Sequence, residues 1–127
     1  MTDISDAADL LTTACDAFVS QLLPALANEH RYVGLMIANA MAIAARECRL
    51  GRDAAQNEAA RLQKLLTDLS PHSHPSASGL AALRRAASVA IRSGCFDDPV
   101  GGKAVTAELL HAVADWVAIS NPKALQA

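Results

Sequence analysis

Apolar side chains recur every three or four residues along almost the whole chain, and this spacing restricts the fold more than any other feature. Within residues 29–50 two neighbouring apolar stripes follow it and together make a broad apolar face. The apolar residues are mostly Ala and Leu, which are strong helix formers, while aromatic residues make up only 3% of the chain. A β-sandwich or barrel is normally richer in β-branched and aromatic residues. The sequence therefore predicts an all-α protein.

The spacing and its interruptions predict one domain over residues 1–127, built as a bundle of about five helices. Gly51 is predicted to end the second helix in a left-handed cap. Pro24 either stops the first helix near Leu22 or kinks it on its way to Leu26. The second helix, with its double stripe, is expected to be the most buried. The expected helices cover residues 5–22 or 5–26, 29–50, 53–69, 80–93 and 103–119.

Residues 70–79 contain two Pro, four Ser and a Gly, which predicts an irregular loop. His72 and His74 lie in it and resemble half of a metal site, but no further ligand follows at a characteristic spacing, so no metal is expected. Asp97 and Asp98 are interpreted as caps of the last helix, not as cation ligands. Gly94 is expected to cap the fourth helix, and residues 95–102 to form a turn.

The composition also narrows the function. A net charge of −2, without a basic stretch, argues against a nucleic-acid partner. The longest nearly apolar run, residues 32–45, is too short to span a bilayer. Three Cys without CxxC spacing, and an acidic N-terminus unlike a signal peptide, favour a cytoplasmic protein with reduced thiols. We expect no membrane association and no cofactor.

Five residues are candidates for ligand or partner contacts: Asn39, Arg46, Glu47, Trp116 and Asn121. Asn39 lies within an apolar face, so it either contacts a ligand or, as we favour, is buried and hydrogen-bonded inside the protein. Arg46 and Glu47 are interpreted either as a charged site or, more simply, as part of a solvated or interhelical ion pair. His111 has no identifiable nucleophile beside it, so no catalytic residue is assigned.

Several short pieces, in order and over most of the chain, match a known family. They are Leu10-Leu11 with Phe18, residues 23–26, residues 38–43, Arg46-Glu47, Gly51, residues 91–94 and residues 117–122. The sequence resembles a bacterial family of short helical proteins described as a domain of unknown function. The resemblance implies genes beside, or fused behind, aminoglycoside-phosphotransferase-like kinases, often near acyl-CoA dehydrogenase-like enzymes.

The chain departs from that family's pattern at three charged positions. Leu35 replaces a basic residue, Ser120 replaces an acidic one, and no Lys lies near Trp116. A site built from those charges in the family would therefore lack them here.

Two functions of different classes follow from these observations. The first is a non-catalytic accessory or interaction protein that partners a phosphotransferase-like or acyl-CoA-metabolising enzyme, or a second copy of itself as a homodimer. The alternative is a helical bundle that binds an acyl or CoA-like small molecule. An independent enzyme ranks third.

Overall fold

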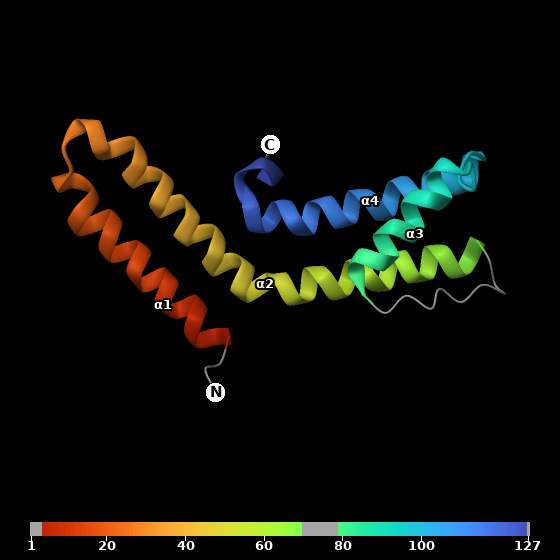
Figure 1. Ribbon diagram of the computed structural model, residues 1–127, viewed down its shortest axis with the longest axis horizontal. Helices are drawn as coiled ribbons and strands as arrows, with labels where there is room; N and C mark the ends of the chain where they lie inside the picture. Colours follow the sequence, from red (N-terminus) through yellow and green to blue (C-terminus); the bar gives the residue numbers. More distant parts are fainter. Residues whose placement is uncertain (1–3, 70–78, 127) are drawn as a thin grey trace. The chain divides into compact units, whose positions relative to one another are not determined.

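The computed structural model describes residues 4–69 and 79–126. No strand occurs in these residues, so the all-α prediction is confirmed. Figure 1 shows the four α-helices that carry the fold: α1 (Ile4–Ala17), α2 (Arg31–Leu69), α3 (Leu80–Arg92) and α4 (Pro99–Ser120). The predicted loop, with His72 and His74, lies outside the described residues except for Gly79.

The chain divides into two compact units, which we describe separately. Met1–Arg52 and Val117–Ala127 make up the first unit, and Asp53–Trp116 makes up the second. Both α2 and α4 contribute residues to each unit. The expectation of one domain over residues 1–127 stays a prediction.

Pro24 lies where α1 gives way to the turn before α2. The α-helical pattern changes at Phe18 into a π-helical segment, Phe18–Leu22, and then into a 3-10 turn, Leu23–Ala25. The helical backbone ends at Leu26, which is extended with ψ 143°. Because Pro lacks an N–H, a short 3-10 turn accommodates it better than a helix interior. The α-helix therefore ends at Ala17, and other helical turns continue to Ala25. The helical backbone stops between the two predicted ends, Leu22 and Leu26.

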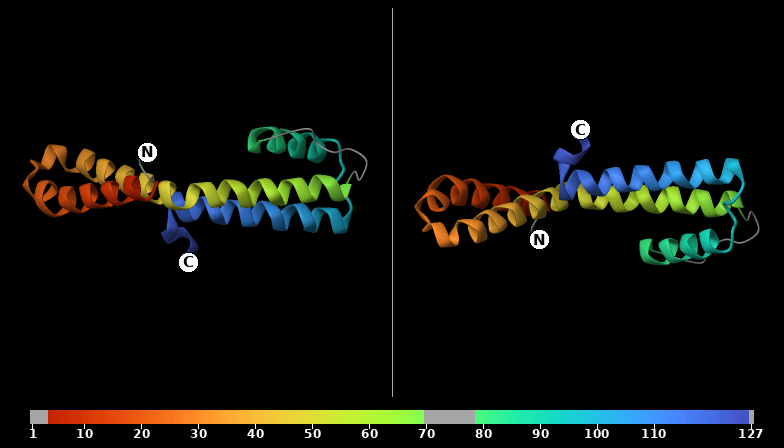
Figure 2. Two further views of the ribbon diagram at one scale, coloured as in Figure 1. Left: turned by 90° about the horizontal axis from the view of Figure 1, so that it is seen from below. Right: turned by 90° about the horizontal axis from the view of Figure 1, so that it is seen from above.

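Small side chains on α2 let α1 pack closely against it. Gly34 and Ala38 are buried on this face, and the Cys15 Sγ of α1 lies 3.4 Å from the Ala38 carbonyl oxygen. A Cβ atom at Gly34 would lie 2.7 Å from the Cδ1 atoms of both Leu23 and Leu26. Figure 2 shows the resulting pair, with α1 alongside the first part of α2. Because small residues fill this contact, the backbone of α2 lies close to α1 and to the turn that follows it.

Gly51 does not end a helix, and the predicted cap is wrong. α2 is continuous from Arg31 to Leu69, and Gly51 has no positive φ. The helices expected at 29–50 and 53–69 are one helix. Gly in a helix costs about 1 kcal/mol relative to Ala, but buried Ala45 and Ala54 on either side show that tertiary packing holds both flanks helical.

The core of the second unit joins α2 and α3. Leu62 of α2 packs with Leu83 and Ala87 of α3, and three partly buried residues surround them: Ala59, Leu66 and Leu80. Gly94, with φ 82°, ends α3 as predicted. Its N–H donates to the Ile91 carbonyl (3.1 Å), and the N–H of Cys95 donates to the Ala90 carbonyl (3.1 Å). This pair of bonds is the Schellman motif.

Asp98 caps α4, as predicted for one of the acidic residues before the last helix. Its Oδ2 atom accepts the Gly101 N–H at 2.9 Å, and its carbonyl accepts the Gly102 N–H at 2.8 Å. The turn predicted over residues 95–102 is too long, because α4 already begins at Pro99. A Pro in the first turn loses no hydrogen bond, and its fixed φ suits a helix start.

Candidate functional site

Residues 31–40 of α2 bury small side chains and expose large ones. Gly34 and Ala38 are the buried positions, and the large apolar residues are more than two-fifths exposed: Tyr32 (74%), Val33 (53%), Leu35 (57%), Met36 (55%) and Ile37 (46%). The prediction that this helix is the most buried is therefore wrong for its first ten residues. An amphipathic helix on a protein surface normally turns its large apolar residues to the core. This segment has an apolar face on both sides, and the first unit covers only one of them.

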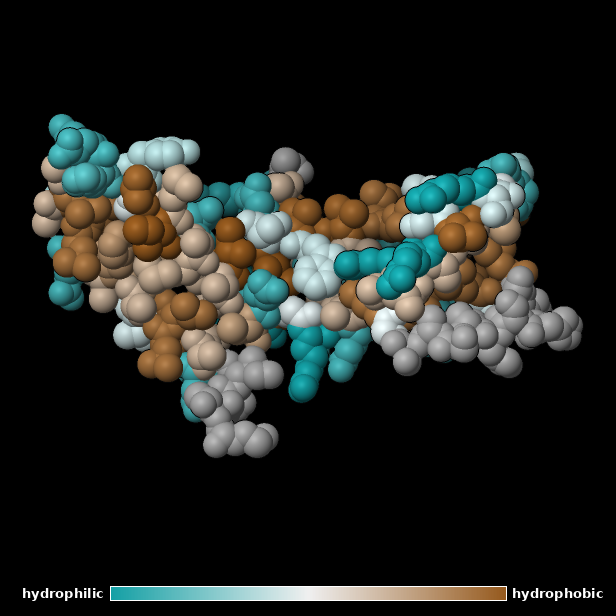
Figure 3. Space-filling view, in the orientation of Figure 1, coloured by the Kyte–Doolittle hydropathy of each residue, from teal (hydrophilic) through white to brown (hydrophobic). Residues whose placement is uncertain are grey.

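The exposed side has a defined centre. At 3.6 residues per turn, positions 32, 36 and 39 lie within about 60° of one another and on the opposite side of α2 from Gly34. We call Tyr32, Leu35, Met36 and Asn39 the outer stripe. Figure 3 shows hydrophobic surface over α1 and the first part of α2. Further large apolar side chains of the first unit are exposed outside α2, namely Leu10, Val19 and Leu22.

Asn39 is exposed, and its predicted burial is wrong. It follows buried Ala38 by one residue, which turns it by about 100° away from the α1 side of the helix. Its amide lies at the C-terminal end of the outer stripe. Asn39 does lie among apolar residues, as the sequence indicates, but its neighbours Leu35 and Met36 face solvent and not the core.

Arg46, Glu47 and Asn121 lie in the first unit with separate local roles. The Nε atom of Arg46 donates to the carbonyl oxygen of Ile119 at 2.6 Å, so its cation meets the C-terminal end of α4. Glu47 is exposed. Asn121 is exposed too, and its N–H donates to the Val117 carbonyl at 2.8 Å. It precedes a 3-10 segment, η4 (Pro122–Gln126). The structure thus brings Arg46 to the C-terminal end of α4. Asn121 directly follows that end in the sequence.

Trp116 belongs to the second unit, where it joins a polar cluster that sequence reasoning missed. The carboxylate of Glu58, only 8% exposed, accepts two bonds from Arg84: Nε to Oε1 at 2.6 Å and Nη2 to Oε2 at 2.7 Å. The indole Nε1 of Trp116 donates to Oε2 at 2.7 Å. The Arg84 guanidinium also lies 5.8 Å from the centroid of the Trp116 ring. One carboxylate thus holds side chains from α3 and α4.

The charges in this cluster are stable near neutral pH. The hydrogen bonds from Arg84 lower the pKa of Glu58; burial opposes this effect and the Trp116 bond adds to it. The same pairing raises the pKa of Arg84. A general acid or base works best with a pKa near the working pH. The cluster, which we call the clasp, joins α2, α3 and α4 through the Glu58 carboxylate.

A signal for Glu58 was present in the sequence. It lies four residues after Ala54 and four before Leu62, both buried, so it occupies the inner stripe of α2. Arg84 gives no comparable signal, because it is a charged residue on an exposed part of α3.

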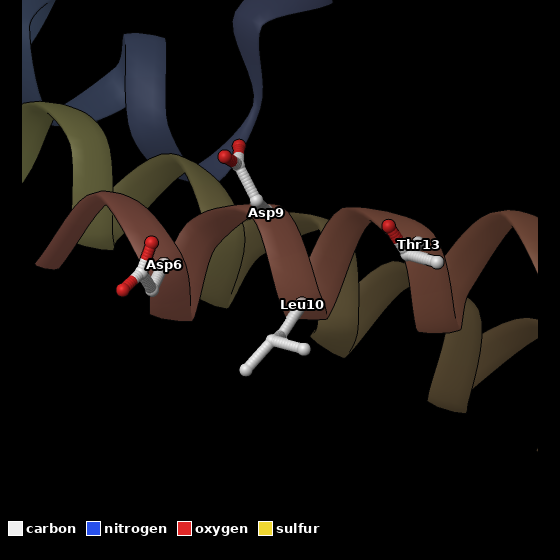
Figure 4. Close-up of a pocket in the computed structure, with 4 residues that line it drawn as sticks. All are labelled: Asp6, Asp9, Leu10 and Thr13. Carbon is white, nitrogen blue, oxygen red and sulfur yellow. The ribbon is translucent and has the colours of Figure 1, made fainter. Parts of the chain in front are cut away.

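The hollows of the first unit are shallow. The one drawn in Figure 4, about 390 Å³, is lined by Asp6, Asp9, Leu10 and Thr13. All four come from α1, and Figure 4 shows the side chains of Asp9 and Leu10 pointing in different directions. Another, of about 220 Å³, is lined by Leu23, Pro24, Arg31 and Leu35. The described residues that line these two hollows do not converge as the polar groups of a small-molecule site do.

A third hollow lies between α1 and α2, and the side chains of two arginines, Arg46 and Arg49, line it. Its volume is about 210 Å³, and its lining is Thr12, Cys15, Asp16, Ala42, Ala45, Arg46 and Arg49. Arg49 is engaged, because its Nη2 atom lies 3.3 Å from Asp9 Oδ1 and 3.1 Å from Thr12 Oγ1. Sites for drug-sized ligands usually measure about 300–1,000 Å³. This hollow is below that range.

In the part of the chain that the structure describes, no three His, Cys, Asp or Glu side chains are grouped to hold a metal ion. Over those same residues, no helix combines the length and apolar character needed to cross a membrane.

The comparisons with known proteins give one match. The family described as a domain of unknown function, DUF6285, matches residues 24–124, which is most of the chain. No curated protein matches, and no solved structure matches.

Proposed function

We propose that this chain, which belongs to the DUF6285 family, acts as a non-catalytic interaction protein. Its partner in this proposal is a phosphotransferase-like or acyl-CoA-metabolising enzyme, the class that the sequence resemblance implies. The binding surface is the outer stripe of α2 and the apolar residues around it.

The observation that carries this proposal is the inverted arrangement of residues 31–40. Ala38 faces α1 and Gly34 faces the turn that follows α1, while Tyr32, Leu35 and Met36 face solvent. Large contiguous apolar surface on a soluble protein usually marks an interaction site. Interface centres are also poor in charged residues, and residues 32–45 contain none.

The alternative, a bundle that binds an acyl or CoA-like molecule, has less support. Its best location is the hollow beside Arg46, of about 210 Å³. A nucleotide-bearing ligand needs a larger pocket than this. The Nε atom of Arg46 is also engaged with the Ile119 carbonyl.

Sedimentation velocity of the purified chain mixed with a phosphotransferase-like protein of the same genome tests the proposal. We expect a mixed complex, weakened at least tenfold by Met36→Glu, because the new carboxylate would have to be desolvated in an apolar interface. Val89→Glu is the matched control: Val89 of α3 is 59% exposed, against 55% for Met36, and lies in the other unit. It should bind like the wild type.

Absence of a mixed complex with enzymes of both classes would overturn the proposal. Equal binding by Met36→Glu and Val89→Glu would show that the outer stripe is not the interface. Circular dichroism on both variants checks that the helices are intact.

A further inference from the structure

We propose that a second copy of this chain covers the outer stripe, with the two α2 segments antiparallel and a twofold axis between Leu35 and Met36. This inference rests on the proposed function only in taking the outer stripe as an interaction surface, and it names a second copy of the chain as the occupant of that surface. A twofold interface is isologous, so the same patch must be complementary to itself. The outer stripe meets this requirement in charge, in polarity and in length.

The first requirement is charge. A patch with a net charge opposes an identical patch placed against it, because like charges in an interface are unfavourable. The run from Tyr32 to Ala45 has no Asp, Glu, Lys, Arg or His. With the axis between Leu35 and Met36, residues 32–39 of one copy meet residues 32–39 of the other, so the centre of the interface holds no charge. The charged residues 29–31 lie at its two ends, opposite the uncharged residues 40–42 of the second copy.

The second requirement is polarity. The outer stripe has a polar group at each end, the hydroxyl of Tyr32 and the amide of Asn39, with Leu35 and Met36 between them. An axis midway between Leu35 and Met36 is equally far in sequence from Tyr32 and from Asn39. In an antiparallel pair, each Tyr32 therefore lies opposite the Asn39 of the second copy. A phenol can donate to an amide oxygen, and the contact occurs twice by symmetry.

The third requirement is length. With this axis, Ile43 of one copy lies opposite Asn28 of the other, which begins the 3-10 turn before α2. Ile43 is also where the outer side of α2 becomes partly buried, and three residues later Arg46 binds the end of α4. The paired segment thus ends where other residues of the first unit begin to cover the outer side of α2. The open part of the stripe is as long as the pairing needs.

An antiparallel pair of α1–α2 hairpins makes a four-helix arrangement, a common way to bury a second apolar face. A polar residue within such an apolar seam fixes register, as a single Asn does in coiled coils. Tyr32 and Asn39 have this role here: a one-turn shift that moves the axis toward the C-terminus of α2 would place each amide opposite Met36 of the second copy.

Sedimentation equilibrium of the full-length wild-type chain is the primary test and requires no substitution. We expect a dimer. Met36→Glu should raise the dimer Kd at least about 100-fold, because it places two carboxylates beside the axis and like charges there cost several kcal/mol. Val89→Glu should leave the Kd unchanged. A wild-type chain that stays monomeric at its highest soluble concentration overturns the inference.

Disulfide trapping tests the antiparallel register. The three native thiols are replaced by Ser, and Tyr32→Cys and Asn39→Cys are made separately in this background, with one variant tagged. We expect a disulfide-linked dimer when the two are mixed and oxidised, and little when either is oxidised alone. Strong cross-linking of each variant alone indicates parallel pairing and overturns the inference. If the Ser background does not fold, double electron–electron resonance between labels placed away from the stripe gives the same distinction.

Failure here and failure of the proposed function give different results. If the chain is monomeric and binds an enzyme through a surface that Met36→Glu disrupts, the dimer is ruled out and the proposed function stands. If the chain is a dimer and binds neither class of enzyme, the proposed enzyme partner is ruled out and the dimer stands.

Discussion

Glu58 and Arg84 form a two-point ion pair, with Nε–Oε1 and Nη2–Oε2 distances of 2.6 and 2.7 Å. Trp116 binds the same carboxylate. The arrangement of α2, α3 and α4 within the second unit therefore depends on one buried acid and its two donors. Buried charges are tolerated when their hydrogen bonds are made and are costly when one partner is removed.

Removing Arg84 should destabilise the protein. Arg84→Met leaves the Glu58 carboxylate with one remaining partner among those described, and we expect the free energy of unfolding to fall by about 1–3 kcal/mol. Arg85→Met, at an exposed neighbouring position, should change it by less than about 0.5 kcal/mol. Urea denaturation of both variants measures the difference. Equal values for the two variants would contradict the clasp.

Acid should remove the contribution of Glu58. Its folded-state pKa is lowered, so the folded protein holds fewer protons at this group than the unfolded chain. The stabilisation is fully present above the unfolded pKa, about 4.3, and is lost as pH falls through the lowered folded value. The stability difference between wild type and Glu58→Gln, measured in urea from pH 7 to pH 3, should shrink below about pH 4.3. A constant difference would contradict this.

Enlarging Gly34 should push α2 away from the turn that follows α1. A Cβ there already approaches Leu23 and Leu26 to 2.7 Å, so Gly34→Leu overfills the contact. We expect a loss of about 1–3 kcal/mol, measured by thermal unfolding. Ala40→Leu is the control, because Ala40 is exposed on the same helix. An equal melting temperature for Gly34→Leu and wild type would show that Leu23 and Leu26 do not pack on Gly34.

Gly51→Ala should stabilise the protein. Because Gly51 lies inside α2 without a positive φ, Ala gains up to about 1 kcal/mol of helix propensity. The new Cβ would lie 3.2 Å from Cγ of Glu47, whose exposed side chain can move. Gly94→Ala is the opposite control, since φ 82° strains any L side chain and should lower stability. Destabilisation by Gly51→Ala would instead support the cap predicted from sequence.

Local features of the fold could be predicted from sequence. The positive φ at Gly94 and the cap at Asp98 were predictable, since each depends on a few neighbouring residues. Gly51 shows the limit of such reasoning. Its local pattern resembles a helix end, but packing on both sides keeps the helix continuous.

The sequence alone determined that the chain is all-helical and which residues share a helix face, because the 3.6-residue period depends only on the local backbone. Tertiary structure decided which face is covered. On α2 it placed the side of Gly34 and Ala38 against α1 and the turn that follows it, and left Tyr32 and Met36 exposed, because small residues allow the closer approach. It also brought Arg84 and Trp116 to Glu58 across separations of 26 and 58 residues. No local pattern specifies pairings over such distances, since they arise only when the helices pack.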